Sequence, residues 1–246
     1  MLGLPWAVLL ALWTAVPHLS ERYAALVPSP ASVLRHALPM LADGSLFVHW
    51  AASASRVIGG VLLGGAGGGA GGFRARLVRR RPAAADAAPE LFFRALPPIA
   101  LIPLTIVYFG IGEAAKILVL VYAAFFTAVV VLYEGISRIA PIYVNVARTL
   151  GASERELFLR VVLPLALPHV LTATRVALGV GWMTLVASEL VSAQNGLGSM
   201  IQVAASYFQL EVIYLGLICI GFTAMAMDFL LVRLSARLVG WQERVK

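Results

Sequence analysis

Histidine and cysteine are the side chains of this chain that most often bind metals or act as nucleophiles. No two of the histidines have the i,i+4 spacing that places two ligands on one face of a helix. Cys219 lies within an apolar run and has no second cysteine to pair with, so we interpret it as a small packing residue. The sequence therefore predicts no metal site, no cofactor and no catalytic residue. The four histidines are His18, His36, His49 and His169.

Two further features have the composition of nucleotide-binding loops without their pattern. The glycine run GGAGGGAGG at 64–72 has neither the preceding strand nor the acidic ribose partner of a dinucleotide-binding loop. Lys116 and Lys246 are the two lysines, and neither follows the G-x-x-x-x-G pattern of a P-loop. We therefore expect a chain that is not itself an enzyme and does not hydrolyse ATP.

The composition indicates a membrane protein. Hydrophobic residues make up 61% of the 246 residues and charged residues 13%, and the mean hydropathy is +0.89. A soluble domain has about 45–50% apolar and about 25% charged residues. The net charge of +7 comes almost entirely from arginines between apolar stretches, which is typical of cytoplasmic loops. This composition excludes a disordered chain, a nucleic-acid-binding domain and most soluble enzymes.

Six apolar segments approach the length of a bilayer-spanning helix, which is about 20 residues. The first, at 2–19, lacks the basic start and the cleavage site of a signal peptide, so we expect it to be retained. We divide the chain into an N-terminal helix with an external segment (1–50) and a transmembrane domain (51–246). The remaining segments begin at about 51 or cover about 95–110, 114–133, 170–191 and 212–232.

The positive charges give these segments an orientation. Basic residues gather between the second and third segments, between the fourth and fifth, and after the sixth, whereas the alternate connections carry only Arg22, Arg35 and Lys116. The positive-inside rule then places both termini in the cytoplasm, which requires an even number of spans. The three groups are Arg74, Arg76, Arg79, Arg80, Arg81 and Arg94; Arg138, Arg148, Arg155 and Arg160; and Arg233, Arg237, Arg244 and Lys246.

The second segment contains an unusual glycine pattern. Gly60, Gly64, Gly68 and Gly72 have GxxxG spacing, which allows two membrane helices to approach closely. Each glycine nevertheless costs about 1 kcal/mol in a helix interior relative to alanine. A compensated frameshift would also produce this low-complexity run and the arginine- and alanine-rich run that follows it to residue 90. The sequence leaves both interpretations open.

The loop at 134–168 carries the most specific pattern. A helix is predicted over 147–159, interrupted at Gly151, and Ser153 with Glu156 has the spacing of a capping box. The Leu-Pro pairs at 163–164 and 167–168 are expected to end the segment where the fifth span begins. The loop therefore predicts a pair of short helices along the cytoplasmic face.

The run ARTLGASERELFLRVVLPLALP in this loop resembles the EAA loop of permease subunits in bacterial ABC importers. That pattern has Glu-Ala-Ala, three residues, Gly, nine residues, Ile, one residue and Leu-Pro. Residues 97–117 and 188–221 and the C-terminal RLVGWQ are similar to the sulfonate, nitrate and taurine permeases, and the similarity fails at 64–90. The pattern's places are taken by Asn145, Val146, Ala147, Gly151, Val161, Leu163 and Pro164, so two of the first three residues depart from it.

The resemblance implies an all-α type I importer permease with six spans in the cell inner membrane. It implies a homodimer that binds a dimer of ABC ATPase subunits, which carry ATP and Mg²⁺, and a periplasmic or lipid-anchored substrate-binding protein, but no nucleic acid. Leu157 is expected to insert into the ATPase as the apolar anchor. The residues that match the ATPase-coupling positions are Ala147, Arg148, Gly151, Ala152, Ser153, Glu154, Leu157, Leu163 and Pro164.

Ionisable residues inside apolar segments are candidates for the translocation pathway. Arg175 and Asp228 lie within the fifth and sixth segments. Arg175 would suit an anionic substrate, would simply pair with an acidic group or would sit near the inner interface; Glu189 would contact the delivery protein or close an outer gate. Taurine or another aliphatic sulfonate is the first expectation for the solute. Nitrate, bicarbonate and a thiamine-precursor-like solute are alternatives, and a secondary transporter or an integral membrane enzyme is the competing class.

Overall fold

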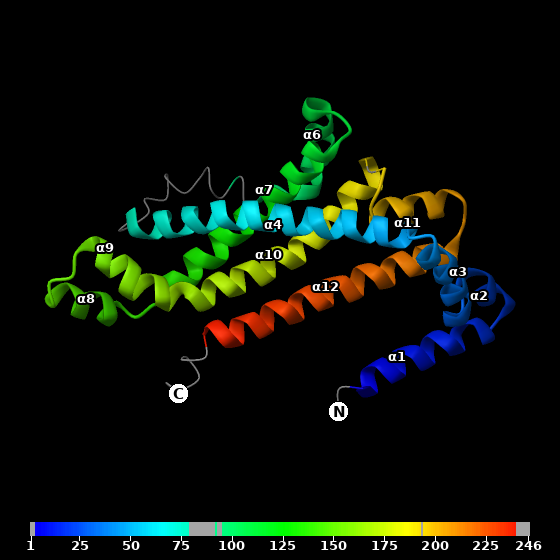
Figure 1. Cartoon of the computed structure of the whole chain (residues 1–246), viewed down its shortest axis with the longest axis horizontal. Helices are drawn as coiled ribbons and strands as arrows, with labels where there is room; N and C mark the ends of the chain where they lie inside the picture. The colour runs from blue at the N-terminus through cyan, green and yellow to red at the C-terminus, as the bar shows by residue number, and fades with distance from the viewer. Residues whose placement is uncertain (1–2, 79–91, 93–94, 193, 240–246) are drawn as a thin grey trace. The chain divides into compact units, whose positions relative to one another are not determined.

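The computed structural model describes residues 3–78, 92, 95–192 and 194–239, and within these ranges there are helices and turns but no strand. The predicted all-α class is thereby confirmed. Within the same ranges, three short segments differ from the α-helix: 3-10 turns at Val16–His18 and Pro98–Leu101, and a π-helical turn at Leu157–Val162. The labelled helices in Figure 1 are α1 (Gly3–Ala15), α2 (Glu21–Leu26), α3 (Pro30–Ala42), α4 (Ser45–Val78), α6 (Ile102–Phe109), α7 (Glu113–Ser137), α8 (Pro141–Thr149), α9 (Glu154–Glu156), α10 (Leu163–Ser192), α11 (Leu197–Ser206) and α12 (Leu210–Leu238).

Among the residues that the structure describes, four helices are long and apolar enough to cross a bilayer: Ser45–Gly72, Glu113–Ser137, Glu154–Val191 and Leu210–Leu238. They coincide with the second, fourth, fifth and sixth predicted spans. The first and third predicted spans coincide with the shorter apolar helices Leu4–His18 and Pro98–Phe109. At a rise of about 1.5 Å per residue, neither of these is long enough alone to cross a hydrocarbon core of about 30 Å. These two spans stay predictions.

The chain forms two compact units, and three of its long helices pass from one unit to the other. The first unit contains Met1–Ser55 and Val186–Thr223, and the second contains Arg56–Leu185 and Ala224–Lys246.

In the first unit, side chains from the N-terminal helices bond to backbone and side chains of later segments. The Trp13 indole donates to the Pro28 carbonyl at 2.9 Å, and the Trp50 indole donates to the Thr223 hydroxyl at 2.9 Å. The start of α4 is capped by Asp43, whose carboxylate accepts from the Ser45 N–H at 2.8 Å. This hydrogen bond holds the pKa of the Asp43 carboxyl below its usual value.

In the second unit, the glycine run is helical and lies against α7. A Cβ at Gly60 would lie 2.5 Å from the Cβ of Leu120, and one at Gly64 or Gly68 would overlap backbone carbonyl oxygens of α7. The absence of side chains therefore allows the two backbones to approach closely, as the GxxxG spacing predicts. Residues 79–90 of the following low-complexity run lie outside the described residues.

Substitutions on the two faces of this glycine run should change the stability of the protein in opposite directions. Gly65 lies on the open face, with nothing within 4 Å of a built Cβ, so Gly65→Ala should stabilise the helix by about 0.5–1 kcal/mol. Gly68→Ala would force α4 and α7 apart and should destabilise by about 1–3 kcal/mol. Thermal unfolding of the two purified variants in detergent measures this. Equal shifts for both variants would contradict the packing.

Candidate functional site

The bend between α8 and α9 is built by the backbone around Gly151. Gly151 has φ +81°, and its N–H donates to the Arg148 carbonyl at 3.0 Å. The Ala152 N–H donates to the Ala147 carbonyl at 3.1 Å. These two bonds form a Schellman motif, which ends a helix with a residue in the left-handed region and favours glycine there. The glycine is therefore required by the bend itself.

Ser153 starts the next helix immediately after the bend. Its hydroxyl accepts from the Glu156 N–H at 3.3 Å, and the Glu156 carboxylate accepts from the Ser153 N–H at 3.1 Å. The predicted capping box is confirmed. Arg148 and Glu154 are joined across the bend at 3.1 Å, but both side chains are exposed, so the pair contributes no more than about 1 kcal/mol. The bend is fixed by its backbone bonds and its cap.

An apolar surface covers one face of α8 and the bend. We define this coupling face as Ile142, Tyr143, Val146 and Leu150, which follow helical spacing and are at least half exposed, with Leu150 reaching 82%. Leu157 is only 3% exposed and packs inside the chain. The expectation that Leu157 is the apolar anchor for a partner is therefore wrong for this structure, because its side chain is already buried.

The helix does not end at the Leu-Pro pairs, contrary to the prediction. A continuous helical segment runs from Glu154 through the π-helical turn at Leu157–Val162 into α10. Leu163 and Pro164 begin α10, and Pro168 lies inside it. Local π-type adjustments accommodate the missing N–H groups of prolines in long membrane helices. Figure 1 shows α8 and α9 folded back on each other at the N-terminal end of α10.

Glu189 is buried in the first unit, at 1% exposure. Its carboxylate accepts from the Ser53 hydroxyl at 2.8 Å and from the Gly198 N–H, at the start of α11, at 2.9 Å. The Ser53 hydroxyl in turn accepts from the Leu197 N–H at 2.8 Å. Ser53 and Glu189 thus each satisfy one free N–H group at the start of α11, and the carboxylate lies at the positive end of the helix dipole. A buried helix cap does not fit the expected contact with a delivery protein.

The two glycines before and within α11 leave space for this carboxylate. A Cβ at Gly196, which has φ +140°, would overlap the Glu189 carboxyl group, and one at Gly198 would lie 2.7 Å from the Glu189 Cβ. The short helix α11 begins directly after Gly196, at Leu197.

Arg175 and Asp228 form a bidentate ion pair in the second unit. The Arg175 Nε and Nη2 each lie 2.8 Å from one oxygen of the Asp228 carboxylate. Each residue lies about one helical turn from the predicted cytoplasmic end of its span. Since the two spans run in opposite directions, the two residues lie at the same predicted depth in the membrane. Both side chains stay nearly half exposed, at 44% and 45%.

A second ionic cluster lies at the expected outer ends of α4 and α7. Glu113 accepts from the Arg56 Nε at 2.6 Å and from the Lys116 Nζ at 2.8 Å. Arg56 and Lys116 are buried, whereas Glu113 is half exposed. Glu113 is not among the predicted site residues, although an acidic residue that begins an apolar helix three positions before a lysine is a recognisable signal. The cluster fixes α4 to α7 at this end.

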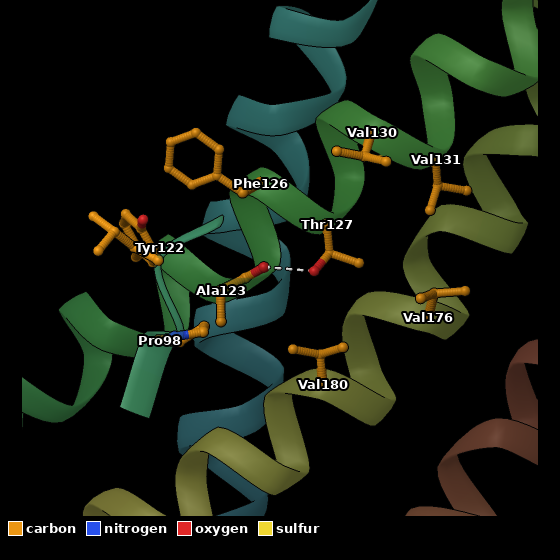
Figure 2. Close-up of a pocket in the computed structure, with 10 residues that line it drawn as sticks. Pro98, Tyr122, Ala123, Phe126, Thr127, Val130, Val131, Val176 and Val180 are labelled. Atoms are coloured by element: carbon orange, nitrogen blue, oxygen red, sulfur yellow. Dashed lines mark hydrogen bonds between the residues drawn. The ribbon is translucent and has the colours of Figure 1, made fainter. Parts of the chain in front are cut away.

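An apolar cavity of about 300 Å³ lies in the second unit between α7, α10 and the segment before α6. Figure 2 shows valine and aromatic side chains around it, with the Thr127 hydroxyl turned toward its own helix. That hydroxyl donates to the Ala123 carbonyl at 2.7 Å. The cavity therefore presents no charged group to an anion. No three His, Cys, Asp or Glu residues gather as metal ligands within the part of the chain that the structure describes.

Comparison with known proteins relates these features to transport. The family model of the binding-protein-dependent transport system inner membrane component matches residues 91–241. A probable ABC transporter permease protein of Brucella abortus is 39% identical over 90% of this chain and 88% of its own length. The taurine transport system permease protein TauC of Escherichia coli is 34% identical over 98% of this chain and 89% of its own. These relatives share nearly the whole chain.

Other relatives carry different solute names. A putative aliphatic sulfonates transport permease protein, SsuC of Bacillus subtilis, is 30% identical over 96% of this chain and 85% of its own. The bicarbonate transport system permease protein CmpB of Synechococcus elongatus is 32% identical over 82% of this chain and 70% of its own. Among solved structures, an inward-facing MetNI methionine ABC transporter chain has a TM-score of 0.70 at 21% identity, covering 81% of this chain and 98% of that one. The last comparison shows that the fold is shared.

Proposed function

The chain belongs to the family of inner membrane components of binding-protein-dependent transport systems, and from this premise we propose that it is the permease of an ATP-driven sulfonate importer. Its solute is a small aliphatic sulfonate such as taurine. The similarity to TauC over 98% of the chain carries this assignment, and the similarity to the aliphatic sulfonate permease supports it. The bicarbonate permease shares less of its length with this chain.

In this proposal the chain has no catalytic chemistry of its own. ATP and Mg²⁺ are bound by a dimer of partner ATPase subunits, and the loop at 134–168 transmits their movement. The coupling face supports this role, because an exposed apolar helix face at the edge of a membrane domain favours a protein partner. The rigid bend at Gly151 and the capping box at Ser153 hold that face in a fixed orientation.

The complete transporter contains two copies of this chain and a substrate-binding protein on the outer side. Both termini face the cytoplasm and the protein lies in the cytoplasmic membrane. Arg175 and Asp228 lie at the same predicted depth in the membrane, and an ion pair between two helices requires matched depths. The pair therefore supports the predicted positions of these two spans in the membrane.

The solute assignment is tested by uptake of radiolabelled taurine in cells that depend on this transporter and its partners. Unlabelled ethanesulfonate should compete with taurine, whereas nitrate and bicarbonate in the same excess should not. Vanadate, which inhibits ABC ATPases, should stop uptake, whereas an ionophore that only dissipates ion gradients should not. Competition by bicarbonate or nitrate alone would move the assignment to that anion. Uptake driven by an ion gradient would favour a secondary transporter.

A further inference from the structure

The ion pair between Arg175 and Asp228 is unusual among the charged groups of the described helices. Of the other charged residues in the described part of the predicted spans, Arg56, Lys116 and Glu189 lie near the expected outer ends and are buried. Arg175 and Asp228 are nearly half exposed although they lie within apolar helices. An exposed charge within a span faces a water-filled path or another protein, because hydrocarbon solvates it poorly.

The exposed face of α10 around Arg175 differs from the faces expected against lipid. The exposed residues along this face are Thr172, Arg175, Val176, Gly179 and Met183, of which three are polar or lack a side chain, and a Cβ built at Gly179 has nothing within 4 Å. The exposed face of α4 in the same unit instead carries large aliphatic side chains, Ile58, Leu62 and Leu63. Polar and small residues on α10 are typical of a surface that borders a path for solute.

The geometry of the pair leaves the guanidinium able to bind a second oxyanion. Asp228 engages the Nε and Nη2 groups, so the Nη1 donors lie outside this fork. A sulfonate has three oxygens and the same charge as a carboxylate, and planar guanidinium groups bind such oxyanions through paired N–H groups. Asp228 thus acts as the counter-ion of Arg175 while no solute is present.

From these observations we propose that Arg175 contacts the anionic group of the solute within the translocation path, and that Asp228 competes with the solute for it. The proposal rests on the proposed sulfonate transport and adds the residue that recognises the charge. The pair keeps the resting path electrically neutral. The pair also prevents tight binding of the anion, because the Asp228 carboxylate pairs with the Arg175 guanidinium again when the solute leaves.

The test uses the thiol of Gly179→Cys, one turn from Arg175, in a Cys219→Ala background and in the complete transporter. The probe is a methanethiosulfonate reagent that carries an ethylsulfonate, compared with its trimethylammonium analogue. Leu63→Cys is the matched control, since it is exposed in the same unit on the aliphatic face. Both reagents are added to both sides of membrane vesicles, and labelling rates are measured.

We expect the Gly179→Cys thiol to react with the sulfonate reagent at least about tenfold faster than the Leu63→Cys thiol. The ratio of anionic to cationic labelling should rise about tenfold with Asp228→Asn and fall about tenfold with Arg175→Gln, as a change of local charge predicts. Equal slow labelling of both thiols would place the face against lipid or protein and overturn the proposal. A ratio of anionic to cationic labelling that neither substitution changes would also overturn the proposal. Wild-type taurine uptake is measured separately, so failure of the sulfonate assignment is recognised independently.

Discussion

Replacing Leu150 with Asp is expected to leave the protein in the membrane but to abolish ATP-driven uptake. Leu150 is 82% exposed, so its loss removes no internal packing. It is the most exposed residue of the coupling face, and a carboxylate there would have to be desolvated on docking. An interface anchor of this kind contributes about 2 kcal/mol or more, which corresponds to at least about 30-fold weaker binding of the ATPase.

Gly151→Val should also abolish ATP-driven uptake, in this case by straining the backbone. At φ +81° a β-branched residue is strained, so the Schellman bend would open and turn the coupling face away. The measurement is recovery of the ATPase with the tagged permease, together with taurine uptake at matched expression. Arg160→Gln is the control, since its exposed pair with Glu156 contributes little. Normal uptake by both Leu150→Asp and Gly151→Val would show that this loop is not the coupling element.

Leu157→Asp separates folding from coupling within the same loop. Because Leu157 is 3% exposed, a carboxylate there would be buried without a partner, and the variant should be lost from the membrane before any transport defect is seen. Stable Leu157→Asp protein with a selective uptake defect would restore the interpretation of Leu157 as the partner's anchor.

Glu189→Ala is expected to cause a large loss of stability. The substitution would remove the acceptor of the Ser53 hydroxyl and of the Gly198 N–H in a buried site. Each unsatisfied buried donor costs about 1–3 kcal/mol, so a total of about 3 kcal/mol is expected. Glu189→Gln retains one acceptor oxygen and should lose less.

Thermal unfolding of the purified protein in detergent measures the effect of Glu189→Ala. Glu154→Ala is the matched control, because Glu154 is exposed and its ion pair is weak. A Glu189→Ala protein of normal stability that has lost uptake would contradict the cap and favour a direct role in the pathway.

The sequence predicted those features that depend on neighbouring residues. The capping box needs only the spacing of Ser153 and Glu156, and the close approach of α4 to another helix needs only the GxxxG spacing. The bend at Gly151 likewise follows from a glycine after a helical run. Such features are local, so their signals lie within a few positions of sequence.

The features that the sequence could not predict depend on distant contacts. Ser53 and Glu189 are separated by 136 positions, and no local pattern indicates that one caps a helix together with the other. The burial of Leu157 depends on what packs over it, whereas its helical spacing is equally consistent with an exposed anchor. The partner of Arg175 could not be named from the sequence, because apolar segments alone do not define which helices are neighbours.

The most direct measurement is taurine accumulation in proteoliposomes that contain this chain, its ATPase and its substrate-binding protein. We expect accumulation that requires ATP with Mg²⁺ and the binding protein, that stops with Leu150→Asp, and that ethanesulfonate inhibits. Accumulation without the ATPase, or none with any sulfonate while another solute is imported, would contradict this expectation.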